Sequence, residues 1–181
     1  GRIDPQAGEQ FGIAQRQLDH FAQLADGIAH SADIVVVDLA APGASLRIFE
    51  GNVAMMDAAD AIVANLTPFR GAGADPGTVY ELGYMAGRGK LCLAYCNDPA
   101  PYAERLARLT EVSMSVDDRL TDRDGLTVED FGLPDNLMMI HALELHGAPL
   151  VVPQAPPSDI WRDLAAFEAC IRLAAENPDR S

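Results

Sequence analysis

The chain has 181 residues, of which 49% are hydrophobic and 22% charged, a composition typical of a globular domain rather than a disordered segment. Its 27 acidic residues against 13 basic ones give a formal net charge of −14. Binding to nucleic-acid phosphates or to an anionic membrane needs a basic face, so we expect neither partner. Because the sequence has no secretory signal pattern and no apolar run of about 18 residues, we expect a cytoplasmic chain with one domain over residues 1–181.

The first third of the chain alternates between helical and strand patterns. Apolar residues at helical spacing predict a helix over residues 9–30, and the β-branched run DIVVVDL predicts a buried strand over 33–39. A turn containing Pro and Gly then leads into a second predicted helix over 46–59. The residues expected on the inward face of that helix are Ile48, Val53, Met55 and Met56.

The middle of the chain continues this alternation. The run DAIVANL predicts a second buried strand over 60–66, and the segment 67–77, dense in Pro and Gly, predicts a loop. Thr78-x-x-Glu81 fits a capping box, which predicts the start of a helix over 78–89.

KLCLAYC predicts a third strand over 90–96. A side-chain period of two places Cys92 and Cys96 on one face of it, where we expect them to act as small buried hydrophobes. Together with Cys170 they lack the spacing of a zinc site, so we expect no metal and no cofactor.

The last part of the chain is mostly helical. Its predicted elements are a helix over 97–109 capped by Asn97 or Asp98, an exposed loop over 113–131, a helix over 133–147, a short possible strand over 148–153, and an amphipathic helix over 156–177 capped by Ser158.

Strands that alternate with helices predict an α/β fold, flavodoxin-like or Rossmann-like, in which a doubly wound and mostly parallel sheet carries helices on both faces. The loops 41–45 and 70–77 follow strands and therefore lie at the edge where such folds bind ligands. Folds of this kind usually open with their central strand, whereas GRIDPQAG leads into a helix, so we expect the usual first strand to be missing from the chain start.

Two carboxylates, Asp75 and Glu81, flank the predicted start of the helix over 78–89. They have an ordinary structural interpretation, with Glu81 in the capping box and Asp75 as a turn residue before Pro-Gly. They can also form an acid–base pair at the ligand edge of the sheet. In that case we expect the helix N-terminus to keep Glu81 ionised and the loop to leave the pKa of Asp75 freer to rise.

Three segments resemble the nucleoside 2-deoxyribosyltransferase family. The longest is DAIVANLTPFRGAGADPGTVYELGYMAGRGK over 60–90, with an Asn-Leu-Thr-Pro-Phe-Arg-Gly strand exit, an Asp, Gly-Thr and Glu-Leu-Gly-Tyr. DFGLPDNLMM over 130–139 and IFEGNVAMMDAAD over 48–60 look like two further elements of that family. The three segments occur in the family's order.

The resemblance implies transfer of a 2-deoxyribosyl group between nucleobases with retained configuration, a pentosyl transfer that serves nucleotide salvage. Glu81 matches the nucleophile that forms a glycosyl-enzyme, and Asp75 matches the carboxylate that moves the proton of the base. Substrate-binding positions implied in the same way are Asn52, Phe69, Gly77, Thr78, Asn136 and Met138. The partners implied are a 2'-deoxynucleoside, a free nucleobase and further copies of the chain, with Asn136 shared across a homo-oligomer interface of a dimer or larger assembly.

Other interpretations of these residues stay open. Asn52 fits a solvated helix position, Asn136 fits a helix N-cap, and Arg70 fits a charge paired with the acidic surface. The methionines fit core or interface positions. Two other activities are also open: hydrolysis of the N-glycosidic bond of deoxynucleosides or their 5'-monophosphates, and nucleoside binding without turnover.

Overall fold

The structure is a computed structural model and describes residues 40–176. The helix predicted over 9–30, the strand predicted over 33–39 and the expected loss of a first strand all lie outside the described residues. The chain divides into two compact units at Ala59 and Asp60, and each unit is described by itself. The single domain over residues 1–181 stays a prediction.

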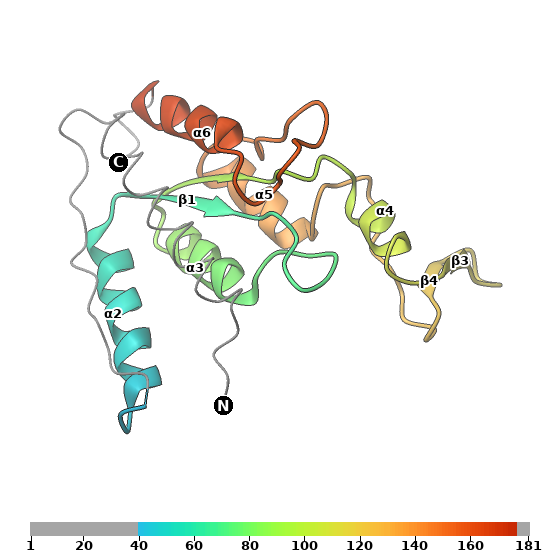
Figure 1. Ribbon diagram of the computed structural model, residues 1–181, viewed down its shortest axis with the longest axis horizontal. Coiled ribbons are helices and arrows are strands. Elements are labelled where there is room, and N and C mark those ends of the chain that lie inside the picture. The colour runs from blue at the N-terminus through green and yellow to red at the C-terminus, as the bar shows by residue number, and fades with distance from the viewer. Residues whose placement is uncertain (1–39, 177–181) are drawn as a thin grey trace. The chain divides into compact units, whose positions relative to one another are not determined.

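Figure 1 labels the elements of the described part of the chain. In chain order they are α2 (Ala44–Ala58), β1 (Ala61–Asn65), α3 (Pro76–Gly87), β2 (Leu91–Tyr95), α4 (Tyr102–Ala107), β3 (Val112–Met114), β4 (Leu120–Asp122), α5 (Leu137–His146) and α6 (Ala165–Glu176).

Helix α2 belongs to the first unit and confirms the helix predicted over 46–59. Its inward face was only partly predicted: Met56 is buried, whereas Ile48 is 37% exposed and Met55 is 46% exposed. The reason is helical geometry. Val53 and Met56 are three residues apart and share a face, while Ile48 and Met55 are seven apart and share a different one.

The second unit is built on a parallel sheet, as predicted. Strands β1 and β2 pair in parallel from Ala61–Leu91 to Asn65–Tyr95. On its other side β2 forms parallel bridges from Cys92 to Gly147 and from Tyr95 to Val151, so the short strand predicted over 148–153 is present as bridges. Every residue of β2 is buried, which is typical of a strand in the middle of a parallel sheet.

Helices pack on both faces of this sheet, which confirms the predicted α/β class. In Figure 1, α6 lies above the β1 arrow and α3 lies below it, and both helices contact both strands. Helix α5 contacts α3 and β2. The face of α6 is anchored by Phe167, whose ring meets that of Tyr95 edge-on at a centroid distance of 6.0 Å, and by Cys170, which is fully buried.

The prediction that Cys92 and Cys96 are buried hydrophobic residues is confirmed, and Cys170 is buried as well. Cys92, Cys96 and Cys170 are all buried and form no disulfide. Burial raises the pKa of the Cys92 thiol to about 11 and that of the Cys170 thiol to about 12. At neutral pH these two side chains therefore stay protonated and unreactive.

The predicted caps of two helices are wrong. Helix α4 begins after Pro101 and has no side-chain cap. Asn97 is instead buried after β2, where its amide nitrogen donates to the main-chain oxygens of Ile160 at 2.8 Å and Asp163 at 3.1 Å. Ser158 does not cap α6, because the chain turns first and α6 begins at Ala165.

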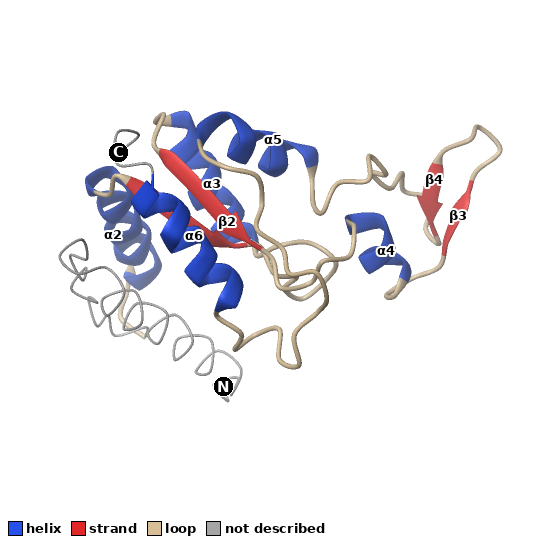
Figure 2. Ribbon diagram, turned by 90° about the horizontal axis from the view of Figure 1, so that it is seen from above, coloured by secondary structure: helices blue, strands red, loops and turns tan. Residues whose placement is uncertain are grey.

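The segment predicted as a loop over 113–131 contains a β-hairpin. Strands β3 and β4 pair antiparallel from Val112–Asp122 to Met114–Leu120, and Ser115 donates its main-chain N–H to Arg119 at 2.8 Å. Figure 2 shows the hairpin beyond α4, at the end of the unit farthest from α6. Strands of three residues are too short for an alternating pattern to stand out in an acidic sequence.

Candidate active site

The candidate active site starts where β1 ends. Leu66 continues the sheet by donating its N–H to Tyr95 at 2.8 Å, and Thr67 is buried. The Thr67 hydroxyl accepts the main-chain N–H of Asn97 at 3.1 Å, which ties together the carboxyl ends of β1 and β2. The loop that leads to α3 therefore leaves from a fixed point at the ligand edge of the sheet.

This loop folds back on itself before α3. Phe69 donates its N–H to Gly73 at 2.9 Å, and Arg70 lies between them with φ of 53°. The Arg70 guanidinium lies 4.9 Å from the centroid of the half-buried Phe69 ring. This stacking gives Arg70 a specific contact within the loop, in addition to the acidic surface considered from the sequence.

Asp75, not Thr78, is the N-cap of α3. Its carboxylate accepts the main-chain N–H of Thr78 at 3.0 Å, and Pro76 occupies the first helical position. The capping box predicted from Thr78 and Glu81 is therefore wrong by three residues. Asp-Pro is the better start signal, since Asp is a preferred N-cap and Pro a preferred first residue.

Gly77 leaves room for this cap. A Cβ atom at residue 77 would lie 2.9 Å from Oδ2 of Asp75, the same oxygen that accepts the N–H of Thr78. Any larger residue would push the carboxylate away from its position. Gly77 therefore controls where the Asp75 carboxylate sits.

Glu81 lies in the second turn of α3, six residues after Asp75. Its pKa is raised, first because it is partly buried and second because of the negative charge of Asp75. The expected cause of its ionisation is wrong, because Glu81 is the sixth residue of α3 and lies too far along the helix for the helix N-terminus to stabilise its charge. The charge of Asp75, at the start of the same helix, therefore acts on Glu81.

Asn136 is the N-cap of α5, one of the interpretations left open above. Its side-chain oxygen accepts the N–H of Met138 at 3.0 Å, while Met138 itself is 72% exposed. Asn136 also lines a cavity of about 340 Å³. The full lining of this cavity is Gly73, Ala74, Val79, Tyr102, Thr127, Glu129, Asp135, Asn136 and Met139.

Asn136 and Glu81 do not line the same cavity. Val79 faces the cavity together with Asn136, and Glu81 follows Val79 by two residues, which is a rotation of ~200° about the helix axis. Glu81 is accordingly absent from the cavity lining. Asn52 lies on α2 in the first unit, so its position relative to these residues is not described.

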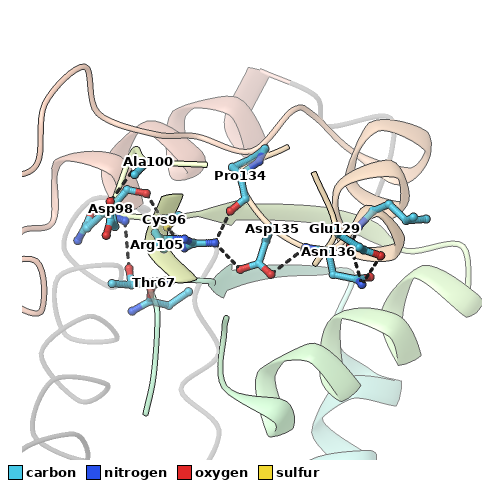
Figure 3. A network of polar contacts seen from close by, with 12 residues as sticks. Thr67, Cys96, Asp98, Ala100, Arg105, Glu129, Pro134, Asp135 and Asn136 are labelled. Atoms are coloured by element: carbon cyan, nitrogen blue, oxygen red, sulfur yellow. Dashed lines mark hydrogen bonds and ion pairs between the residues drawn. The ribbon is translucent and has the colours of Figure 1, made fainter. Parts of the chain in front are cut away.

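The structure adds three charged residues that sequence reasoning missed. Arg105 and Asp135 form a buried ion pair at 2.9 Å (Figure 3). Glu129 accepts a hydrogen bond from the side-chain amide nitrogen of Asn136. Arg105 and Asp135 are thirty residues apart, and Glu129 stands seven residues before Asn136 in the hairpin region. No periodic pattern links such positions in the sequence.

The described residues hold neither a candidate metal site nor a helix that could cross a membrane. Within residues 40–176, no three His, Cys, Asp or Glu side chains gather in a way that could hold a metal ion. Among the described helices, none is long and apolar enough to cross a membrane.

Comparison with known proteins gives one matching family and two relatives of this α/β chain. The family described as Nucleoside 2-deoxyribosyltransferase matches residues 8–138, more than half of the chain. An uncharacterized protein of Schizosaccharomyces pombe is 35% identical over 124 residues, which cover 61% of this chain and 59% of the relative's length. A solved 2-deoxyribosyltransferase from Leishmania mexicana is 34% identical with a TM-score of 0.49, covering 77% of this chain and 72% of that one.

The chain belongs to the nucleoside 2-deoxyribosyltransferase family. The family match includes Asn52, the loop after β1, Asp75 and Glu81, and it ends at Met138. It therefore includes residues of both units, from α2 in the first to the start of α5 in the second.

Proposed function

We propose that the chain transfers a 2-deoxyribosyl group between nucleobases by a retaining double displacement. The observation that carries the proposal is that two carboxylates, the N-cap Asp75 and the partly buried Glu81 of α3, lie within the segment that matches the family, where the charge of Asp75 helps to raise the pKa of Glu81. Two carboxylates in different surroundings are what such a reaction needs, one to attack the sugar and one to move the proton of the base.

In the first half-reaction the ionised Glu81 attacks C1' of the deoxynucleoside. A C1'–O bond forms, the C1'–N bond breaks, and its electron pair leaves with the base. Asp75 donates a proton to that base. In the second half-reaction an acceptor base gives a proton to Asp75 and attacks C1', which releases Glu81. Two inversions at C1' give net retention.

The coupling of the two carboxylates favours the covalent intermediate. Asp75 and Glu81 repel each other when both are ionised, and this repulsion contributes to the raised pKa of Glu81. In the proposed first half-reaction the sugar neutralises Glu81 as Asp75 gives up its proton, so the covalent intermediate does not hold two negative charges side by side. Partial burial of Glu81 also favours the intermediate, because burial destabilises the charged carboxylate and the attached sugar neutralises that charge.

We propose that Asn136 acts on the sugar bound to another copy of the chain. Asn136 lines a cavity that Glu81 does not line, which supports a role for Asn136 at a different sugar from the one that Glu81 attacks. Met138, two residues further on, is 72% exposed and supplies apolar surface for a neighbouring chain. This supports a homo-oligomer with shared sites.

The remaining predicted contacts belong to the same proposal. Asn52 binds the sugar, and Phe69 and Met138 provide apolar contacts for the substrate. Gly77 and Thr78 act by fixing the Asp75 carboxylate close to the reacting bond. Gly77 leaves the space that the carboxylate occupies, and Thr78 donates its main-chain N–H to it.

One incubation series tests the proposed reaction. The protein is mixed with 2'-deoxyadenosine or thymidine, with and without a second free base, and the products are separated by chromatography. Exchange of the base supports transfer. Release of base without exchange supports the hydrolase, and binding without any release supports a silent nucleoside-binding protein; either result contradicts the proposal.

A further inference from the structure

The amide of Asn136 is held at both ends. Its oxygen accepts the N–H of Met138, and its nitrogen lies 3.0 Å from each carboxylate oxygen of Glu129. Glu129 also accepts the N–H of Leu137 at 3.4 Å. The orientation of the amide follows from these partners, because the opposite orientation would set its oxygen against a carboxylate.

This arrangement leaves part of the amide available to a ligand. The two N–H bonds of an amide point in widely different directions. The two oxygens of one carboxylate lie close together as seen from the amide nitrogen, so both N–H bonds cannot point at them. A single N–H of Asn136 is therefore shared between the Glu129 oxygens, and the second N–H is left over. The amide oxygen likewise keeps one lone pair beside the bond from Met138. One donor and one acceptor side by side match a hydroxyl group.

The main chain of Asn136 is fixed separately. Asp135 accepts the N–H of Asn136 at 2.8 Å and forms the buried ion pair with Arg105, which also donates to the main-chain oxygen of Pro134. These contacts set the position of the backbone, and the side-chain rotation of Asn136 depends on the bond from Met138 and on Glu129.

Glu129 is itself placed by the hairpin. Its neighbour Val128 is buried and donates its N–H to Leu120 in β4 at 2.8 Å, and Thr127 bridges to Thr121. The hairpin therefore carries the carboxylate that orients the amide at the start of α5.

We propose that Glu129 is a positioning residue that orients the Asn136 amide toward a hydroxyl of the deoxyribosyl group. This inference rests on the proposed function of Asn136. Glu129 acts through Asn136 and has no separate contact with the reacting atoms.

The first test needs no ligand. The side-chain amide protons of Asn136 are assigned by NMR as the pair of signals that is missing in Asn136→Ser. This variant should keep its fold, because Ser can still cap α5. In the wild type the two protons should have well-separated shifts, because only one is bound to a carboxylate. Glu129→Ala should bring the shifts together, while Asp130→Ala, at the exposed acidic neighbour, should leave them apart. Unchanged shifts in Glu129→Ala would overturn the positioning role.

The second test is a double-mutant cycle on the binding of 2'-deoxyadenosine and thymidine by calorimetry. Glu129→Ala and Asn136→Ala should each weaken binding by ~10-fold, and the double variant should bind no more weakly than Asn136→Ala. Glu129→Gln, which keeps an acceptor, should recover much of the loss. Additive losses in the double variant contradict the proposal.

The two proposals fail in different ways. If the cycle behaves as expected but no base exchange occurs, the proposed reaction is wrong while the positioning role of Glu129 stands. If exchange occurs and Asn136→Ala binds as the wild type does, the proposed role of Asn136 is wrong, and that of Glu129 with it.

Discussion

Asp75 and Glu81 act on each other through their charges: the carboxylate of Asp75, fixed as the N-cap of α3, helps to raise the pKa of Glu81 in the next turn. Asp75 has a structural role in starting the helix and an electrostatic role at the candidate site. The two roles can be separated by substitution, because Asn also caps helices but carries no charge.

Glu81→Gln should make the protein more stable at neutral pH while abolishing transfer. The pKa of the Glu81 carboxyl is higher in the folded state than its ordinary value of 4.5. Such a carboxyl lowers the free energy of unfolding as the pH rises from that ordinary pKa through the pKa of the folded state. Gln has no such charge to bury. Urea unfolding from pH 4 to 8 should show that the free energy of unfolding of Glu81→Gln exceeds that of the wild type by an amount that grows with pH.

The matched control for this measurement is Glu104→Gln, because Glu104 is an exposed glutamate on α4. Glu104→Gln should show no comparable pH-dependent increase in the free energy of unfolding. A Glu81→Gln protein that is less stable than the wild type at pH 7, or that still transfers sugar at a similar rate, counts against the assignment of Glu81.

Asp75→Asn should lower the pKa of Glu81 with little change in stability. The substitution removes the repelling charge and keeps an N-cap, whereas Asp75→Ala removes both and should cost ~1 kcal/mol of unfolding free energy. NMR titration of the Glu81 side-chain carbon gives the pKa. Asp75→Asn should also slow transfer from bases that need a proton to leave, and equal rates for every base would remove Asp75 from the mechanism.

Gly77→Ala should reduce activity through Asp75. The new Cβ would lie 2.9 Å from the cap oxygen and displace it. Gly83→Ala on the same helix is the control, since a Cβ there meets nothing within 4 Å, and it should be neutral or stabilise by up to ~1 kcal/mol. Comparable rates in the two variants would show that the position of the Asp75 carboxylate is not critical.

Gly147→Ala should destabilise the sheet by more than ~2 kcal/mol. A Cβ at residue 147 would lie 1.7 Å from the main-chain oxygen of Cys92, and a buried central strand cannot move away. Denaturant unfolding measures the loss. Near wild-type stability would mean that the close approach of this segment to β2 is not as tight as described.

The sequence was sufficient to predict β1, β2 and α3, because continuous apolar runs and a loop dense in Pro and Gly are local signals. The start of α3 was misplaced because Thr78-x-x-Glu81 and Asp75-Pro76 both fit a helix start, and the second one holds. That shift of three residues also places Glu81 beyond the helix N-terminus that was expected to stabilise its charge.

Other features depend on contacts between distant segments. The pairing of Arg105 with Asp135 and of Glu129 with Asn136 arises only once α4, the hairpin and α5 are brought together. Asn97 was assigned to a helix cap by its local sequence, whereas its amide serves the segment that leads into α6. Polar residues with several local options are placed by tertiary structure.

The central claim is that Glu81 carries the sugar during transfer. Incubation with a 2'-fluoro-2'-deoxynucleoside tests it most directly, because fluorine slows breakdown of an oxocarbenium-like intermediate. Mass spectrometry of the digested protein should then find one fluorodeoxyribosyl group on the peptide containing Glu81, and none in Glu81→Gln. A sugar attached to another residue, or base exchange that persists at wild-type rate in Glu81→Ala, would contradict the claim.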